Sequence, residues 1–327
     1  MKAVLCKQYG PPESLVVDDV PSLTASSGQV VIDVHASGVN FPDLLIIENK
    51  YQFKPPLPFS PGGEVAGVVK EAGSGVTNVK VGDRVLASSG FGGFAQEVAC
   101  AAQAVMPIPK EMDFATASAF LMTYGTSHYA LKDRAQLKAG ESLLVLGAAG
   151  GVGLSAVEIG KVLGAHVIAA ASADEKLEVC KRHGADQVIN YAKDDLKQRI
   201  KELTGGQGAD VVYDPVGGDF SEAALRATAW EGRFLVIGFA AGEIPRIPLN
   251  LTLLKGCDIR GVFWGSFVAR EPRRHAANVK ELMEWYVAGK LKPQIYAKYP
   301  MKDVAKALDD IAKRRVTGKV VLLPKEA

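Results

Sequence analysis

The chain has 327 residues, of which 48% are hydrophobic and 23% charged, and its formal net charge is +2. This length predicts two domains, and the composition is that of an ordinary folded globular protein. The sequence has no long block of like charge and no apolar run that could span a bilayer, which argues against a nucleic-acid or membrane partner. Its four cysteines lack zinc-ligand or redox spacing, and no signal-peptide pattern is present, so a reducing cytoplasmic location is expected.

The first 120 or so residues are rich in short strand patterns. Residues 29–39 and 64–73 carry β-branched runs with glycine at or near the end, and residues 81–86 form another short strand after a turn. Four prolines within residues 54–63 exclude a helix or a central strand there. This part of the chain therefore predicts a distorted β-barrel.

The pattern changes from about residue 112 onward. A helical stretch over residues 113–131 is followed by alternating strand and helix patterns. The predicted strands cover residues 143–146, 165–171, 188–191, 209–214, 232–238 and 258–264, with helices at 173–183, 194–203 and 220–229. Alternation of strand and helix predicts a parallel sheet with helices on both faces.

The last segment returns to a different pattern. Residues 275–287 and 304–314 predict helices, and residues 319–323 predict a terminal strand. We therefore expect an α/β protein of two domains, one formed by residues 1–122 with 266–327 and the other by the inserted residues 123–265.

A glycine-rich turn follows the strand at residues 143–146. Gly147, Gly151 and Gly153 lie between that strand and a helix pattern, and a second strand follows at the distance expected for a strand–helix–strand unit. Such a turn lets the backbone approach a pyrophosphate, and the helix N-terminus directs free N–H groups at the anion. The predicted phosphate-binding residues are Ala149, Gly150, Gly151, Val152 and Gly153.

The end of the second strand bears on the choice of dinucleotide. Ser172 stands where NAD-specific folds place an acidic residue for the ribose 2′-hydroxyl, and Lys176, one turn into the next helix, is close enough in sequence to reach a 2′-phosphate. Ser172 with Glu175 also fits a helix capping box, so the serine alone does not distinguish an NADPH site from an NAD site. Asp174 leaves an alternative open, since it favours NAD if its side chain turns inward, whereas in solvent it complements the helix dipole.

The arrangement resembles the medium-chain dehydrogenase/reductase superfamily along its whole length. The resemblance rests on Gly62–Gly67, Val81–Val85 and Gly147–Gly153. Gly38–Asp43 and Leu121–Thr126 are similar to the quinone oxidoreductase branch, which includes zeta-crystallin. The resemblance implies a GroES-like catalytic domain and a Rossmann domain, with NADPH bound in the cleft between them.

Two departures from the zinc alcohol dehydrogenases bear on metal binding. Those relatives carry a cysteine where this chain has Asn40 and a histidine where it has Gly63. Glycine has no donor side chain and an asparagine amide is a poor zinc ligand, and the cysteine-rich structural zinc lobe is also missing. The sequence therefore predicts a mechanism without zinc.

The quinone oxidoreductase resemblance also implies a set of site residues. Asn40 and Thr123 would face the nicotinamide, and Ser172, Lys176 and Tyr191 would match the NADPH pocket. Tyr51 matches the second of two tyrosines of that branch, whereas the first is replaced by Leu45. The catalytic candidates are Asn40, Tyr51 and Thr123, and the segments expected beside the nicotinamide are Gly238, Phe239 and Ala240 with Phe263 and Trp264.

The activity implied is hydride transfer from NADPH to a quinone or an α,β-unsaturated carbonyl. An enoyl-thioester reductase is one alternative, although no basic entrance for a coenzyme A phosphate is evident. A non-catalytic, crystallin-like NADPH-binding protein is another. An apolar sixth strand at residues 259–264 is expected at a sheet edge, and it predicts a homodimer.

Overall fold

The computed structural model describes residues 1–326 and divides the chain into two compact units. Unit 1 comprises Met1–Met122 with the residues from Pro293 onward, and unit 2 comprises Thr123–Lys292. The segment 266–292 therefore lies in unit 2, whereas the sequence had placed it with the first domain. Helices α9 (Trp264–Arg270) and α10 (Pro272–Val287) are part of unit 2, where the Phe267 ring of α9 stacks on that of Tyr129 with the ring centroids 4.0 Å apart.

Unit 1 is built on a seven-stranded sheet in the order β14-β15-β3-β4-β5-β7, with β6 also paired to β3. Strand β3 is its centre, because β4, β6 and β15 all pair with it antiparallel. The strands of this unit are β1 (Lys2–Leu5), β2 (Val16–Asp19), β3 (Gln29–Val39), β4 (Glu64–Ala72), β5 (Arg84–Ser88), β6 (Glu97–Ala101), β7 (Val105–Pro107), β14 (Ile295–Pro300) and β15 (Lys319–Leu323). The predicted distorted barrel of short strands is confirmed.

Helices of unit 1 are few and short. They are α1 (Phe41–Ile47), α2 (Phe114–Ala117) and α11 (Val304–Ala312), with 3-10 turns η1 (Pro12–Ser14), η2 (Ala102–Ala104) and η5 (Met301–Asp303). Helix α1 begins directly after Asn40, which lies outside the helix as its N-cap residue. Pro42 lies in the first turn of α1, where its missing N–H leaves no hydrogen bond unmade.

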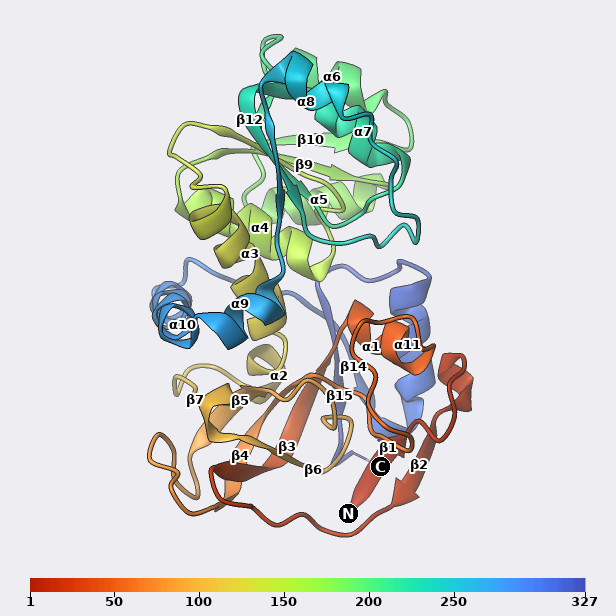
Figure 1. The fold of residues 1–327 in the computed structure, drawn as a ribbon, viewed down its shortest axis with the longest axis vertical. Helices are drawn as coiled ribbons and strands as arrows, with labels where there is room; N and C mark the ends of the chain where they lie inside the picture. The colour runs from red at the N-terminus through yellow and green to blue at the C-terminus, as the bar shows by residue number, and fades with distance from the viewer. Residues whose placement is uncertain (327) are drawn as a thin grey trace. The chain divides into compact units, whose positions relative to one another are not determined.

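Unit 2 holds a six-stranded parallel sheet in the order β10-β9-β8-β11-β12-β13. Helices α4 and α5 cover one face, and α6, α7 and α8 cover the other (Figure 1). The strands are β8 (Ser142–Val145), β9 (His166–Ala171), β10 (Gln187–Asn190), β11 (Ala209–Asp214), β12 (Thr228–Val236) and β13 (Asp258–Gly261), and the helices between them are α4 (Gly151–Val162), α5 (Asp174–Arg182), α6 (Leu196–Leu203), α7 (Asp219–Arg226) and α8 (Asn250–Lys255). This strand order is that of the dinucleotide-binding Rossmann fold.

The predicted long helix over residues 113–131 has an unusual pitch. Its central part is formed by π-helical η3 (Leu121–Gly125), α3 (Thr126–His128) and π-helical η4 (Tyr129–Arg134). Gly125 faces the Trp264 ring so closely that a Cβ there would lie 2.9 Å from it. π-Helical turns are frequent at functional sites, and this one contains Thr123.

Within the described chain, no helix combines the length and the apolar character that a membrane span requires. Cys6, Cys100, Cys180 and Cys257 are all buried, and none forms a disulfide.

Candidate active site

The glycine-rich turn of unit 2 connects β8 to α4. Gly147 adopts a left-handed φ of 57°, which glycine tolerates without steric cost. A Cβ on Gly153 would lie 2.4 Å from the Gly147 carbonyl oxygen, so only glycine lets the helix pack on the turn. Gly150 has ordinary space, since its nearest contact for a Cβ would be 3.4 Å away.

The start of helix α4 fits an anionic cofactor. Gly150 is the N-cap residue, with φ −74° and ψ 173°, and its carbonyl accepts the first helical hydrogen bond from Leu154 N at 2.8 Å. N–H groups of the first helical turn have no partner within the helix and attract anions. Residues Ala149–Gly153 lie at the carboxyl edge of the sheet, the place where this fold binds nucleotides, and their contact with a phosphate stays a prediction.

The predicted 2′-phosphate residues come together at the ends of β9 and β10. The two strands pair in parallel, and Tyr191 N donates to Ala171 O at 3.1 Å. Tyr191 is half-buried, and its ring lies 4.4 Å from that of Phe220. Lys176 is half-buried on α5, and Ser172 is exposed.

The capping box expected at Ser172 does not form. Helix α5 begins at Asp174, and Ala173 is its N-cap residue without a side-chain hydrogen bond. The Asp174 carboxylate accepts hydrogen bonds from Asn190 Nδ2 at 2.5 Å and Lys193 Nζ at 2.6 Å. Both partners come from the end of β10 and the loop after it, so this side chain is neither directed inward nor alone in solvent.

The two segments expected beside the nicotinamide differ in character. Gly238, Phe239 and Ala240 form a half-buried loop tied to the end of β11, with Ala240 N donating to Pro215 O at 3.0 Å. Phe263 is 63% exposed, whereas Trp264 is 6% exposed and packs on Gly125. Trp264 begins helix α9 instead of ending the sixth strand. Its ring belongs to the core of unit 2, so of the two aromatic residues Phe263 is the one available to a ligand.

Thr123 is buried and is held by a chain of hydroxyl groups. Its carbonyl accepts from Ser155 Oγ at 3.1 Å, Ser155 contacts Ser127 Oγ at 2.8 Å, and Ser127 contacts Tyr213 OH at 2.8 Å. Tyr124 OH donates to the buried Glu158 carboxylate at 2.8 Å. These contacts fix the π-helical segment on α4 and β11.

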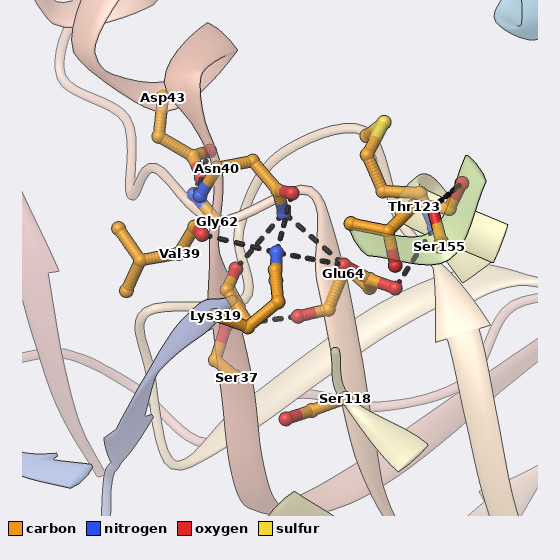
Figure 2. A network of polar contacts seen from close by, with 12 residues as sticks. Ser37, Val39, Asn40, Asp43, Gly62, Glu64, Ser118, Thr123, Ser155 and Lys319 are labelled. Atoms are coloured by element: carbon orange, nitrogen blue, oxygen red, sulfur yellow. Dashed lines mark hydrogen bonds and ion pairs between the residues drawn. The ribbon is translucent and has the colours of Figure 1, made fainter. Parts of the chain in front are cut away.

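Asn40 lies in a buried polar network of unit 1 (Figure 2). Its amide Nδ2 donates to Gly38 O at 3.2 Å and Glu64 Oε2 at 3.1 Å, and its Oδ1 accepts from Lys319 Nζ at 2.5 Å. Lys319 also donates to Val39 O at 3.0 Å. Antiparallel pairing explains the meeting, because β4 and β15 both begin where β3 ends. Both amide hydrogens of Asn40 are engaged, so its contact with a cofactor stays a prediction.

Asp43 and Tyr51 lie beside this network. The Asp43 carboxylate accepts from Asn40 N at 2.8 Å and Gly62 N at 3.1 Å, and burial raises its pKa to about 6. The Tyr51 ring packs half-buried on an apolar cluster that includes Leu44 and Ile47. Burial, followed by the nearby Asp43 charge, raises the pKa of the Tyr51 phenol. Tyr51 is therefore a neutral hydroxyl at physiological pH.

The residues at the zinc-ligand positions of the alcohol dehydrogenases do not fit a metal. The Asn40 amide is held by protein groups, and a Cβ on Gly63 would lie 3.1 Å from the Gly90 carbonyl oxygen. Residues 1–326 contain no group of three or more His, Cys, Asp or Glu side chains arranged to hold an ion.

Sequence reasoning missed Lys319 and the cluster around Asn190. Lys319 is 6% exposed and opens an apolar terminal strand, where a lysine is expected at a solvated strand end. Its burial follows from the pairing of β15 with β3, a contact across 279 residues. A lysine followed by four aliphatic residues was the only local signal.

The fold and these two sites define the chain as an oxidoreductase with a Rossmann nucleotide-binding unit and a GroES-like unit. Family profiles match accordingly, "Alcohol dehydrogenase GroES-like domain" over residues 26–110 and "Zinc-binding dehydrogenase" over residues 151–286. The latter is a family name, and Asn40 and Gly63, at the zinc-ligand positions of the alcohol dehydrogenases, do not fit a zinc ion.

Full-length relatives specify the family further. The chain is 41% identical to quinone oxidoreductase-like protein 2 homolog of Nematostella vectensis, over 99% of this chain and 89% of that protein. Escherichia coli quinone oxidoreductase complexed with NADPH superposes with a TM-score of 0.94 at 30% identity, covering 99% of this chain and 100% of that one. A 2-haloacrylate reductase superposes with a TM-score of 0.86 at 30% identity over both full chains. The chain belongs to the quinone oxidoreductase family of the medium-chain dehydrogenases/reductases.

Proposed function

We propose that this protein is a zinc-independent NADPH-dependent reductase that transfers hydride to a quinone or an α,β-unsaturated carbonyl. The observation that carries the proposal is the nucleotide site of unit 2. There the glycine cradle at Gly150–Gly153 lies on the same sheet edge as Lys176 and Tyr191, and the Asp174 carboxylate is taken up by Asn190 and Lys193. The Escherichia coli relative solved with NADPH supports the same cofactor.

The cofactor, when bound, supplies the hydride. The chain's own part is to hold the pyrophosphate at the α4 N-terminus and the 2′-phosphate near Lys176. We assign Asn40, Tyr51 and Thr123 to the reacting end, with the loop Gly238–Ala240 and Phe263 beside the nicotinamide.

The proposed substrate class follows from how a proton reaches the product. A reduced quinone or an enolate takes its proton from water, whereas reduction of a simple ketone needs polarisation by an acid or a metal. None of the residues that we assign to the reacting end is a histidine, and the one phenol among them, Tyr51, has a raised pKa. The 2-haloacrylate reductase relative, named for a conjugated substrate, agrees with a preference for conjugated acceptors.

The test is NADPH oxidation against quinones, enones, enoyl thioesters and simple ketones. We expect turnover with quinones or enones and none with ketones. A preference for enoyl thioesters would identify the protein as an enoyl-thioester reductase. NADPH binding without turnover on any acceptor would establish a non-catalytic role. Tyr51→Phe is expected to change mainly KM, whereas a fall in kcat of roughly 100-fold would make Tyr51 a general acid.

Two further properties belong to this proposal. We propose that the purified enzyme holds no stoichiometric zinc, which elemental analysis measures directly and one tightly held zinc per chain contradicts. We also propose a homodimer formed through β13, because this strand is the edge of the sheet in unit 2 and its Ile259 is 40% exposed.

A further inference from the structure

A cluster of three polar side chains joins the start of α5 to the end of β10. Asn190 is the last residue of β10 and pairs with Ala171, the last residue of β9. This register places the Asn190 side chain beside the turn that leads into α5, where Asp174 is the first helical residue. Asn190 and Lys193 both donate to the Asp174 carboxylate, at 2.5 and 2.6 Å.

Asn190 organises the loop that carries Lys193. Its Oδ1 accepts from Ala192 N at 3.1 Å, and its main-chain carbonyl accepts from Lys193 N at 3.0 Å and Asp194 N at 2.9 Å. Asn190 is 7% exposed, so its hydrogen bonds lie within the packed interior of the unit. Lys193 and Asp174 are themselves 66% and 62% exposed, and such an ion pair on its own contributes little to stability.

The position of Asp174 connects the cluster to nucleotide selection. In folds of this type an acidic residue after the second strand accepts a hydrogen bond from the ribose 2′-hydroxyl of NAD, and the same charge repels a 2′-phosphate. The hydrogen bonds from Lys193, first, and Asn190 hold the pKa of Asp174 below its usual value, so the group carries a negative charge at neutral pH. Here its charge is matched by Lys193 and its direction is set by Asn190.

We propose that Asn190 and Lys193 are specificity-determining residues that act through Asp174. They turn its carboxylate toward the β10 loop and neutralise it, which removes an NAD-type acceptor and leaves the ribose 2′ position open to a phosphate. This inference rests on the proposed binding of NADPH by unit 2. It gives the cluster a role in the preference for NADPH over NADH.

The test is a double-mutant cycle on binding constants. Dissociation constants for NADPH and NADH are measured by fluorescence titration for the natural protein, Lys193→Met, Asp174→Asn and the double variant. Lys193→Met is expected to lower the preference for NADPH over NADH by about two- to fivefold, the range of an exposed charge pair. In the Asp174→Asn background the same change is expected to have less than about a twofold effect, because no charge is left to neutralise.

The cycle separates this inference from the two nearest alternatives. An equal loss of NADPH affinity with and without Asp174 means that Lys193 contacts the phosphate directly, and an unchanged preference in every variant means that the cluster is only structural; either result overturns the inference. Asn190→Ala, checked by its melting temperature, should repeat the Lys193→Met pattern. Lys197→Met, which removes one exposed positive charge from α6, is the matched control and should change neither constant. Absence of NADPH binding by the natural protein would instead contradict the proposed function.

Discussion

Lys176 is the residue whose proposed role is simplest to isolate. A charge-assisted hydrogen bond to a phosphate contributes roughly 1.5–3 kcal/mol. Lys176→Ala is therefore expected to weaken NADPH binding by about one to two decades and to leave NADH binding nearly unchanged. Titration with both nucleotides measures this, and an equal loss for both would show that Lys176 does not contact the 2′-phosphate.

Lys319 is a buried cation next to two buried carboxylates, Asp43 and Glu64. Burial lowers its pKa, while both carboxylates favour the charged form. Lys319→Met leaves those acids without a compensating charge and is expected to lower the free energy of unfolding by about 3–5 kcal/mol. Urea denaturation should show Lys319→Met/Glu64→Gln to be more stable than Lys319→Met alone, and a double variant that is no better would mean that the Lys319 contact with Asn40 carries the effect.

Asp43 predicts a dependence of stability on pH. Its pKa of about 6 in the folded protein lies above the value of about 3.9 for an unfolded chain. Between these values the folded state binds more protons, so the contribution of Asp43 to the unfolding free energy falls as pH rises. The decrease is about 3 kcal/mol in total, of which about 2 kcal/mol falls between pH 4 and 6, and the contribution is constant above about pH 7. The stability difference between the natural protein and Asp43→Asn should decline over that window. Asp19→Asn, at a largely exposed carboxylate of β2, is the control and should show no such decline.

Element-scale features were predictable where a local pattern carries them. Apolar runs of strand length and the glycine turn located the parallel sheet of unit 2, because a buried strand can be recognised from a few consecutive apolar residues. The π-helical turns at residues 121–125 and 129–134 were not predictable from a local pattern, and Gly125 packs against Trp264, a residue far along the chain. The network at Asn40 could not be predicted either, because its positive charge comes from Lys319 in the last strand, β15.

The β8–α4 turn separates the folding role of a glycine from its binding role. Gly153→Ala brings a Cβ to 2.4 Å of the Gly147 oxygen, and it should lower stability by about 1–3 kcal/mol, as overpacking does. Gly150→Ala has room in the free protein, with 3.4 Å to its nearest neighbour, and should cost less than about 1 kcal/mol.

Gly150→Ala, the variant with the smaller expected loss of stability, is expected to weaken NADPH binding strongly. A methyl group at Gly150 would stand where the pyrophosphate approaches the backbone, and we expect an affinity loss of at least about tenfold. Thermal unfolding and nucleotide titration of the same two variants measure both effects. Normal NADPH affinity in Gly150→Ala would place the pyrophosphate elsewhere.

The whole-molecule prediction concerns association. Besides the edge strand β13, unit 2 exposes Trp230, Leu249, Leu253 and Leu254, each at 68% or more. Edge strands are protected by lysine, so Ile259→Lys is expected to convert a dimer into a monomer in sedimentation at micromolar concentration. Val81→Lys, at an apolar residue of unit 1 that is 62% exposed, is the matched control. A natural protein that sediments as a monomer would contradict the proposal.

The burial of all four cysteines affects how readily the protein is alkylated by its proposed substrates. Quinones and conjugated enones are electrophiles that alkylate thiolates, and a thiol is attacked only as far as it is exposed and ionised. Cys6, Cys100, Cys180 and Cys257 are buried, and burial raises the pKa of every one of them. With every thiol buried and its pKa raised, we expect the protein to resist alkylation by the compounds that we propose it reduces.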